Sequence, residues 1–146
     1  MNTSDQHCVL YVEDDADHAE LVLRSLERRK TMAGVVHVGD GEAALDYLSK
    51  SERDEVPRPR LILLDLRLPK VDGLDVLRTV KASRAFAAIP VVILTTSADG
   101  QDISRAYQHH VNSYLVKPHD FAGFEAMVQE LGEYWLLLNR QPAAEH

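Results

Sequence analysis

Acidic side chains and one lysine directly follow apolar runs of strand length in this sequence. Glu13 and Asp14 come after CVLYV, Asp65 comes after LILL, and Lys117 comes after SYLV. A few carboxylate oxygens suit Mg²⁺, which keeps part of its water shell, and a lysine supplies a mobile positive charge to a phosphoryl group. A carboxylate placed among such groups can attack phosphorus and become an acyl phosphate. The pattern predicts a phosphoryl-accepting site around Asp65.

The charges at these positions require compensation. Carboxylates about 4 Å apart repel by ~4 kcal/mol at an effective dielectric constant of 20. If Glu13, Asp14 and Asp65 converge, Mg²⁺ and Lys117 together would bring the site close to neutrality. The run PVVILT ends at Thr95, whose hydroxyl is a neutral donor for a phosphoryl oxygen.

Strands and helices must alternate to bring these residues together. Apolar runs rich in β-branched residues occupy residues 7–12, 34–38, 61–65, 90–95 and 113–116. Helical periodicity covers residues 15–29, 41–50, 73–82, 99–110 and 120–137. Five such alternations predict an α/β, doubly wound, five-stranded parallel sheet with five helices. Ligands of such sheets bind beyond the carboxyl ends of the strands.

Length and composition exclude several classes of protein, including multidomain and membrane-spanning proteins. The 146 residues predict a single domain, 1–146, with its core at about 7–138. A formal net charge of −7 disfavours binding to nucleic acid or to an anionic membrane. No run approaches the ~20 apolar residues of a membrane span, so we expect a cytoplasmic protein. Cys8 is the single cysteine and is expected to be a small core residue.

Four motifs in order resemble the receiver domain of bacterial two-component response regulators. They are VEDD (12–15), LLDLRLPKVDG (63–73), ILTTSA (93–98) and SYLVKP (113–118). The resemblance covers nearly the whole chain. It implies a flavodoxin-like fold with strand order 2-1-3-4-5 and no turnover enzyme activity beyond the chain's own phosphorylation and dephosphorylation.

The resemblance also implies roles for the matched residues. Asp65 would be the phosphoacceptor and a Mg²⁺ ligand, Asp14 a direct Mg²⁺ ligand, Glu13 a ligand through water, and Arg67 a ligand through its backbone carbonyl. Asp15 is interpreted mainly as a helix N-terminal charge.

On the phosphoryl side, the resemblance makes Thr95 and Lys117 the residues that hold the phosphoryl group and Tyr114 the aromatic switch. It further implies a cis Lys117–Pro118 bond. The loop containing PRP, the LTTS run and the ending EYWLLL are similar to single-domain regulators of phytochrome-type histidine kinases. A histidine kinase is therefore the expected partner, with a bacteriophytochrome as the candidate. A stand-alone regulator would signal through protein contacts.

Two other functions compete with this interpretation. A Mg²⁺-dependent phosphohydrolase with an aspartyl-phosphate intermediate would need an acid two residues after the nucleophile, where this chain has Arg67. A flavodoxin-like cofactor binder would need hydroxyl-rich or glycine-rich phosphate loops rather than an acidic cluster.

The last predicted helix carries two apolar stripes. The first contains Phe124, Val128, Leu131 and Trp135, and the second contains Met127, Tyr134 and Leu138. The first stripe is expected to face the core. The second either widens the intramolecular contact or packs against another subunit. Because the family that the chain resembles often dimerises through this side, we expect a homodimer.

Overall fold

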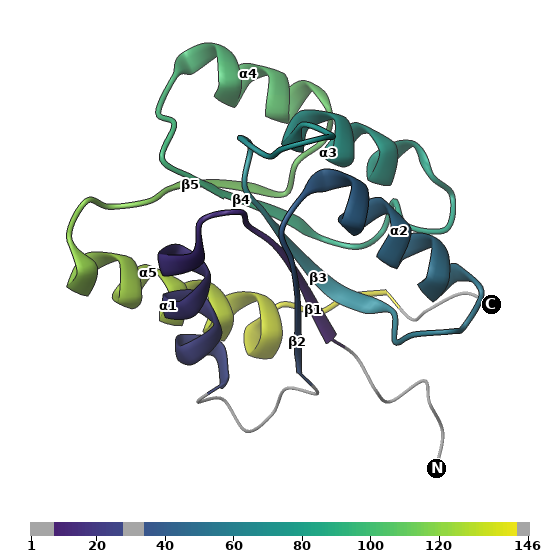
Figure 1. The fold of residues 1–146 in the computed structure, drawn as a ribbon, viewed down its shortest axis with the longest axis horizontal. Coiled ribbons are helices and arrows are strands. Elements are labelled where there is room, and N and C mark those ends of the chain that lie inside the picture. Colours follow the sequence, from purple (N-terminus) through teal and green to yellow (C-terminus); the bar gives the residue numbers. More distant parts are fainter. Residues whose placement is uncertain (1–7, 28–33, 143–146) are drawn as a thin grey trace.

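The strands of the molecule form one parallel sheet in the order β2-β1-β3-β4-β5 (Figure 1). The structure is a computed structural model that describes residues 8–27 and 34–142. The strands are β1 (Cys8–Val12), β2 (Val35–Val38), β3 (Pro59–Leu64), β4 (Val91–Thr95) and β5 (Ser113–Val116). The predicted strand order is confirmed, and β1 and β3, which carry the predicted acidic residues, are neighbours.

Helices cover both faces of the sheet. They are α1 (Ala16–Glu27), α2 (Gly41–Glu52), α3 (Gly73–Ala82), α4 (Gly100–Gln108) and α5 (Phe121–Glu133). Helices α1 and α5 lie on one face, and α2, α3 and α4 lie on the other (Figure 1). Helix α2 is two residues longer than its apolar pattern predicts, and the predicted end of α1 at residue 29 lies outside the described residues.

Alternating side chains of the strands form two apolar cores. Leu10 and Ile62 point towards α2, α3 and α4, whereas Tyr11 and Leu63 point towards α1 and α5. Because both faces are covered, the central strands are apolar along most of their length, and Arg60 of β3 and Thr95 of β4 are the exceptions. Their carboxyl ends therefore hold polar residues on a rigid frame.

Aspartate side chains begin the helices. Asp15 accepts hydrogen bonds from the amides of Asp17 and His18, which confirms it as a helix N-terminal residue. Helices α2, α3, α4 and α5 are capped in the same way by Asp40, Asp72, Asp99 and Asp120. These caps satisfy amides that have no partner within the helix, so they fix where each helix starts relative to the strand before it.

The end of α5 differs from the predicted pattern. A π-helical turn, η2 (Tyr134–Leu138), continues the helix, and the amide of Asn139 donates to the carbonyl of Tyr134 at 2.6 Å. The wider turn moves the buried position from the predicted Trp135, which is only half-buried, to Leu136. Trp135 nevertheless packs against the same core as Phe124, Val128 and Leu131, which confirms that the first stripe faces the core. The change from i, i+4 to i, i+5 bonding adds Leu136, which the predicted spacing did not include.

The sequence predicted a core position for the single cysteine and no helix that spans a membrane. Cys8 is buried at the start of β1, with its sulfur 3.3 Å from the hydroxyl of Tyr47, which confirms a core position. Within residues 8–27 and 34–142, none of the helices has the length and apolar character needed to cross a bilayer.

Candidate functional site

The acidic residues converge where β1 and β3 end. Val12 pairs with Leu64, and the amide of Asp65 donates to the carbonyl of Val12 at 3.1 Å. Glu13, Asp14 and Asp65 each present a carboxylate oxygen within 4.8 Å of the other two. The predicted acidic cluster is therefore present at the rim of the sheet.

Burial disfavours the charged forms of the carboxylates in this cluster. Glu13 is 1% exposed and Asp65 is 7% exposed, whereas Asp14 faces solvent. Burial, together with the nearby carboxyl of Asp65, raises the pKa of Glu13, and Lys117 partly opposes this rise. Three carboxylates exceed the charge of one ammonium. The excess negative charge and the hard oxygen donors fit a divalent cation that retains water, as Mg²⁺ does.

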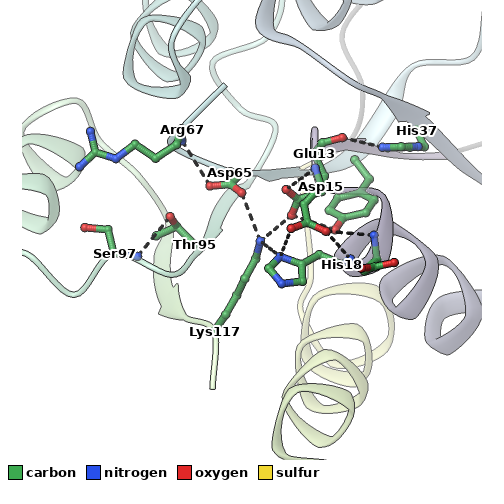
Figure 2. A network of polar contacts seen from close by, with 11 residues as sticks. Glu13, Asp15, His18, His37, Asp65, Arg67, Thr95, Ser97 and Lys117 are labelled. Carbon is green, nitrogen blue, oxygen red and sulfur yellow. Dashed lines mark hydrogen bonds and ion pairs between the residues drawn. The ribbon is translucent and has the colours of Figure 1, made fainter. Parts of the chain in front are cut away.

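Lys117 lies in the middle of the cluster (Figure 2). It is 4% exposed. Its Nζ is 2.5 Å from Glu13 Oε1, 3.2 Å from Asp65 Oδ2 and 2.9 Å from His18 Nδ1. It also lies 5.9 Å from the centroid of the Phe124 ring. The sequence predicted that Lys117 lies at the same site as Glu13 and Asp65, but it did not predict the contacts with His18 and Phe124.

Glu13 forms hydrogen bonds through both its carboxylate and its backbone carbonyl. The hydroxyl of Tyr11 donates to Oε1 at 3.3 Å, and the amide of Asp15 donates to Oε2 at 3.3 Å. The backbone carbonyl of Glu13 lies 2.8 Å from His37 Nε2. Burial raises the pKa of Tyr11 far above its ordinary value, so its hydroxyl remains a donor. Tyr11 lies within an apolar strand pattern, and nothing in that pattern marked it as a site residue.

Thr95 ends β4 at the same rim and is fully buried. The amide of Ser97 donates to its hydroxyl oxygen at 3.4 Å, and the amide of Lys117 donates to its backbone carbonyl at 2.7 Å. Among the described contacts, the hydroxyl of Thr95 meets neither Asp65 nor the Lys117 ammonium. The structure therefore places Thr95 beside the site, with its side chain bound to the loop that follows β4.

A polar chain leads from Asp65 to α4 and β5. The amide of Arg67 donates to Asp65 Oδ1 at 3.3 Å, and its guanidinium binds Asp102 Oδ2 at 2.8 Å. The hydroxyl of Ser97 donates to the same oxygen of Asp102 at 2.6 Å, and the hydroxyl of Tyr114 donates to the carbonyl of Ser97 at 2.9 Å. Tyr114 thus contacts the loop that holds Thr95. The metal-binding role of the Arg67 carbonyl remains a prediction.

The bond between Lys117 and Pro118 departs from the family expectation. The described residues contain no cis peptide bond, so this bond is trans. The trans isomer is the more stable one for X–Pro bonds by about 0.5–1 kcal/mol. The expectation of a cis bond was therefore wrong for this structure.

Comparisons with known proteins agree with this geometry. Residues 9–129 match the model of the response regulator receiver domain. The probable methanogenesis regulatory protein FilR2 of Methanothrix harundinacea is 48% identical over 142 residues, which cover 97% of this chain and 92% of FilR2. Response regulator Rcp1 of Synechocystis sp. is 39% identical over 137 residues, which cover 93% of each chain.

Two solved structures are similar over most of this chain. The Mn²⁺-bound form of Rcp1 is 38% identical with a TM-score of 0.88, covering 94% of this chain and 99% of that one. The phosphorylated cyanobacterial phytochrome response regulator RcpA is 36% identical with a TM-score of 0.89 and the same coverage. One of these relatives was solved with a divalent metal and the other with a phosphoryl modification.

Proposed function

Because the chain belongs to the response regulator receiver family, we propose that it is a stand-alone response regulator whose Asp65 accepts a phosphoryl group from a phosphohistidine of a partner kinase. A carboxylate oxygen of Asp65 attacks phosphorus, the bond from phosphorus to the imidazole nitrogen breaks, and the nitrogen keeps the electron pair. The observation that carries this proposal is the buried contact of Asp65 Oδ2 with Lys117 Nζ at 3.2 Å inside an acidic cluster.

Each residue of the site has a separate role in phosphoryl transfer. Lys117 neutralises charge on the phosphoryl oxygens. Thr95 can donate its O–H to them, because in the described part of the chain its hydroxyl oxygen only accepts from the Ser97 amide, which leaves the proton available. Asp14 and Asp65 would hold Mg²⁺ directly, with Glu13 acting through water and the carbonyl of Arg67 as a further ligand. Bound Mg²⁺ would supply additional neutralisation of the phosphoryl charge.

The same site provides a signal. Phosphorylation adds about one negative charge, since a dianion replaces a monoanion. That charge attracts the ammonium of Lys117 and the hydroxyl of Thr95. The loop after β4 also contacts Tyr114 through the carbonyl of Ser97. Movement of Thr95 therefore changes the surroundings of Tyr114, which acts as the aromatic switch.

Turnover of small phosphate esters is less well supported. A phosphohydrolase of this kind would need a general acid two residues after Asp65. The side chain at that position is Arg67, and its guanidinium binds Asp102 on α4. An arginine is always protonated in proteins and cannot serve as that acid.

Intact mass after incubation with acetyl phosphate and Mg²⁺ tests the phosphoacceptor. We expect one phosphoryl adduct on the native chain and none on Asp65→Asn, which keeps the shape of the side chain but lacks the anionic nucleophile. Asp46→Asn is a matched control, because Asp46 is an exposed carboxylate of α2 that pairs with Lys50, and it should take one adduct. An adduct on Asp65→Asn, or sustained release of phosphate from many small esters, would contradict the proposal.

We infer that the phosphodonor is a phytochrome-type histidine kinase. The similarity to the phytochrome response regulator RcpA over 94% of this chain supports this partner. The same two proteins, native and Asp65→Asn, can be mixed with an autophosphorylated phytochrome-type kinase and with a kinase of another sensory class. Rapid transfer of label from the phytochrome-type kinase to the native chain alone is expected. Equal or faster transfer from the other kinase would reject this partner.

We further propose that the end of the chain forms a homodimer contact. Three apolar side chains of η2 are exposed, namely Tyr134, Leu137 and Leu138. They lie next to one another along the π-helical turn that follows α5. Helix α5 itself packs its apolar face against α1. A second copy would remove these side chains from water.

Light scattering across a concentration series tests the dimer. Leu138→Glu places a charge in the proposed contact, and we expect it to shift the protein to monomer at concentrations where the native chain is dimeric. Tyr107→Glu is the control, because Tyr107 is 52% exposed on α4 and Leu138 is 64% exposed. A native chain that is monomeric throughout, or a Leu138→Glu protein that remains dimeric, would contradict this contact.

A further inference from the structure

Every hydrogen-bond donor of the Lys117 ammonium has an acceptor. A lysine ammonium has three N–H groups and no acceptor. Around Lys117 the three acceptor atoms are Glu13 Oε1, His18 Nδ1 and Asp65 Oδ2. Two of these acceptors are carboxylates of the acidic cluster. The third is Nδ1 of His18 on α1, a helix that contributes no other side chain to this ammonium.

The surroundings of His18 fix its ring. Asp15 accepts a hydrogen bond from the amide of His18 at 3.1 Å, which sets this residue in the first turn of α1. The edge of the His18 ring meets the Phe124 ring, with centroids 5.5 Å apart and an interplanar angle of 76°. Because Nδ1 accepts from Lys117, the ring proton lies on Nε2. Helices α1 and α5 thus hold the ring with its acceptor nitrogen towards the ammonium.

We propose that His18 is a positioning residue for phosphoryl transfer to Asp65. Together with Glu13, it binds two N–H groups of Lys117, so that the third points to the Asp65 carboxylate. This inference rests on the proposed function of Asp65. When Asp65 becomes an acyl phosphate, the third N–H is already directed at the added oxygens, and the contacts with Glu13 and His18 remain. No proton leaves Lys117 in this step.

Two substitutions separate positioning from packing. His18→Phe keeps an aromatic edge against Phe124 but removes the acceptor. His18→Asn keeps an acceptor oxygen at nearly the place of Nδ1 but removes the ring. If His18 only packs against Phe124, the phenylalanine variant should behave like the native chain and the asparagine variant should be impaired. If His18 positions Lys117, the order is reversed.

The first measurement is the rate of adduct formation from acetyl phosphate over a range of Mg²⁺ concentrations. We expect His18→Phe to lower the maximal rate about tenfold, as expected for loss of one hydrogen bond to a charged donor. The half-saturating Mg²⁺ concentration should change less than about twofold, because His18 touches none of the three clustered carboxylates. His18→Asn should restore most of the lost rate. A phenylalanine variant as fast as the native chain would overturn the proposal.

The second measurement does not depend on phosphorylation. A buried and hydrogen-bonded lysine ammonium exchanges its protons slowly, so its ¹H–¹⁵N NMR signal should be visible in the native chain and assignable by its loss in Lys117→Arg. We expect the signal in His18→Asn and its exchange broadening in His18→Phe. A native chain that takes no phosphoryl group would reject the proposed function of Asp65. A native chain that is phosphorylated, with rate and signal unchanged in His18→Phe, would reject the role of His18 alone.

Discussion

Replacing Gly73 with alanine is expected to lower the free energy of unfolding by about 2–3 kcal/mol, the range for overpacking that forces the backbone to shift. A β-carbon at Gly73 would lie 2.3 Å from the Asp65 carbonyl oxygen and 2.6 Å from the Cα of Leu66. These are main-chain atoms, which cannot move aside as a flexible side chain can. The amide of Gly73 also donates to the carbonyl of Leu66 at 2.9 Å, which holds the start of α3 against this loop.

Gly100 offers a matched control for this substitution. Both glycines are the first residue of a helix, and both follow an aspartate that caps it, Asp72 for α3 and Asp99 for α4. A β-carbon at Gly100 would meet nothing within 4 Å, and neither glycine has a left-handed φ. Gly100→Ala should therefore leave stability unchanged or raise it by about 0.4–1 kcal/mol, because alanine reduces the entropy of the unfolded chain.

Urea unfolding of the two variants beside the native chain gives the comparison. The Gly73→Ala protein should also take up less phosphoryl group from acetyl phosphate, because the added carbon pushes on the main chain of Asp65. Equal unfolding midpoints for Gly73→Ala and Gly100→Ala would show that α3 and the loop after β3 do not approach as closely as the structure describes.

Replacing Lys117 with methionine should destabilise the metal-free protein by about 3–5 kcal/mol, the usual cost of removing one partner from a buried ion pair. Methionine keeps most of the side-chain volume, so the change is mainly one of charge. Glu13 and Asp65 would then be buried without their ammonium. Mg²⁺ should recover part of the loss, because a cation that binds the folded state stabilises it.

The loss should depend on pH in a defined direction. Burial already raises the pKa of Glu13, and Lys117 opposes that rise. Without the lysine, folded Glu13 holds its proton to higher pH than unfolded Glu13 does. The unfolded chain then ionises first, so both proteins lose stability as pH rises from the ordinary range of a glutamate to about 7, the pKa of Glu13 in the native chain. The variant should go on losing stability above that pH, and its deficit relative to the native chain should therefore grow there.

Urea unfolding in EDTA and in excess Mg²⁺, at acidic and at alkaline pH, measures both effects. Lys50→Met is the control, since Lys50 and Asp46 form an exposed pair at 3.3 Å whose loss should cost less than about 1 kcal/mol and show no response to Mg²⁺. A Lys117→Met protein as stable as the native chain in EDTA would mean that the ammonium does not compensate the buried carboxylates.

The sequence was sufficient to predict the parts of the site that parallel strands bring together. Strand ends of a parallel sheet lie at one rim, so Glu13, Asp65 and Lys117 could be grouped from their places after apolar runs. The resemblance to receiver domains supplied the strand order, which makes β1 and β3 neighbours. Together these two kinds of information predicted most of the fold and the acidic cluster.

The contacts that the sequence did not predict depend on how each helix is rotated about its own axis. His18 reaches Lys117 because the first turn of α1 directs its side chain towards α5 and the residue that follows β5, and the spacing within DHAEL does not specify that direction. Asp102 meets Arg67 across 35 positions of sequence, a pairing that no local pattern encodes. Leu136 joins the core beside Trp135 because one turn of the helix changes from i, i+4 to i, i+5 hydrogen bonding, which the predicted spacing did not include.

Arg67 contacts Asp65 with its backbone amide and Asp102 of helix α4 with its guanidinium, so one residue links the acidic rim to a surface helix. A protein that binds α4 and competes for Asp102 would thereby alter the environment of Asp65 without entering the rim. Such linkage runs in both directions with the same free energy. A downstream target that bound α4 in this way would then also be an effector of phosphorylation, and its abundance would help to set how readily Asp65 is phosphorylated.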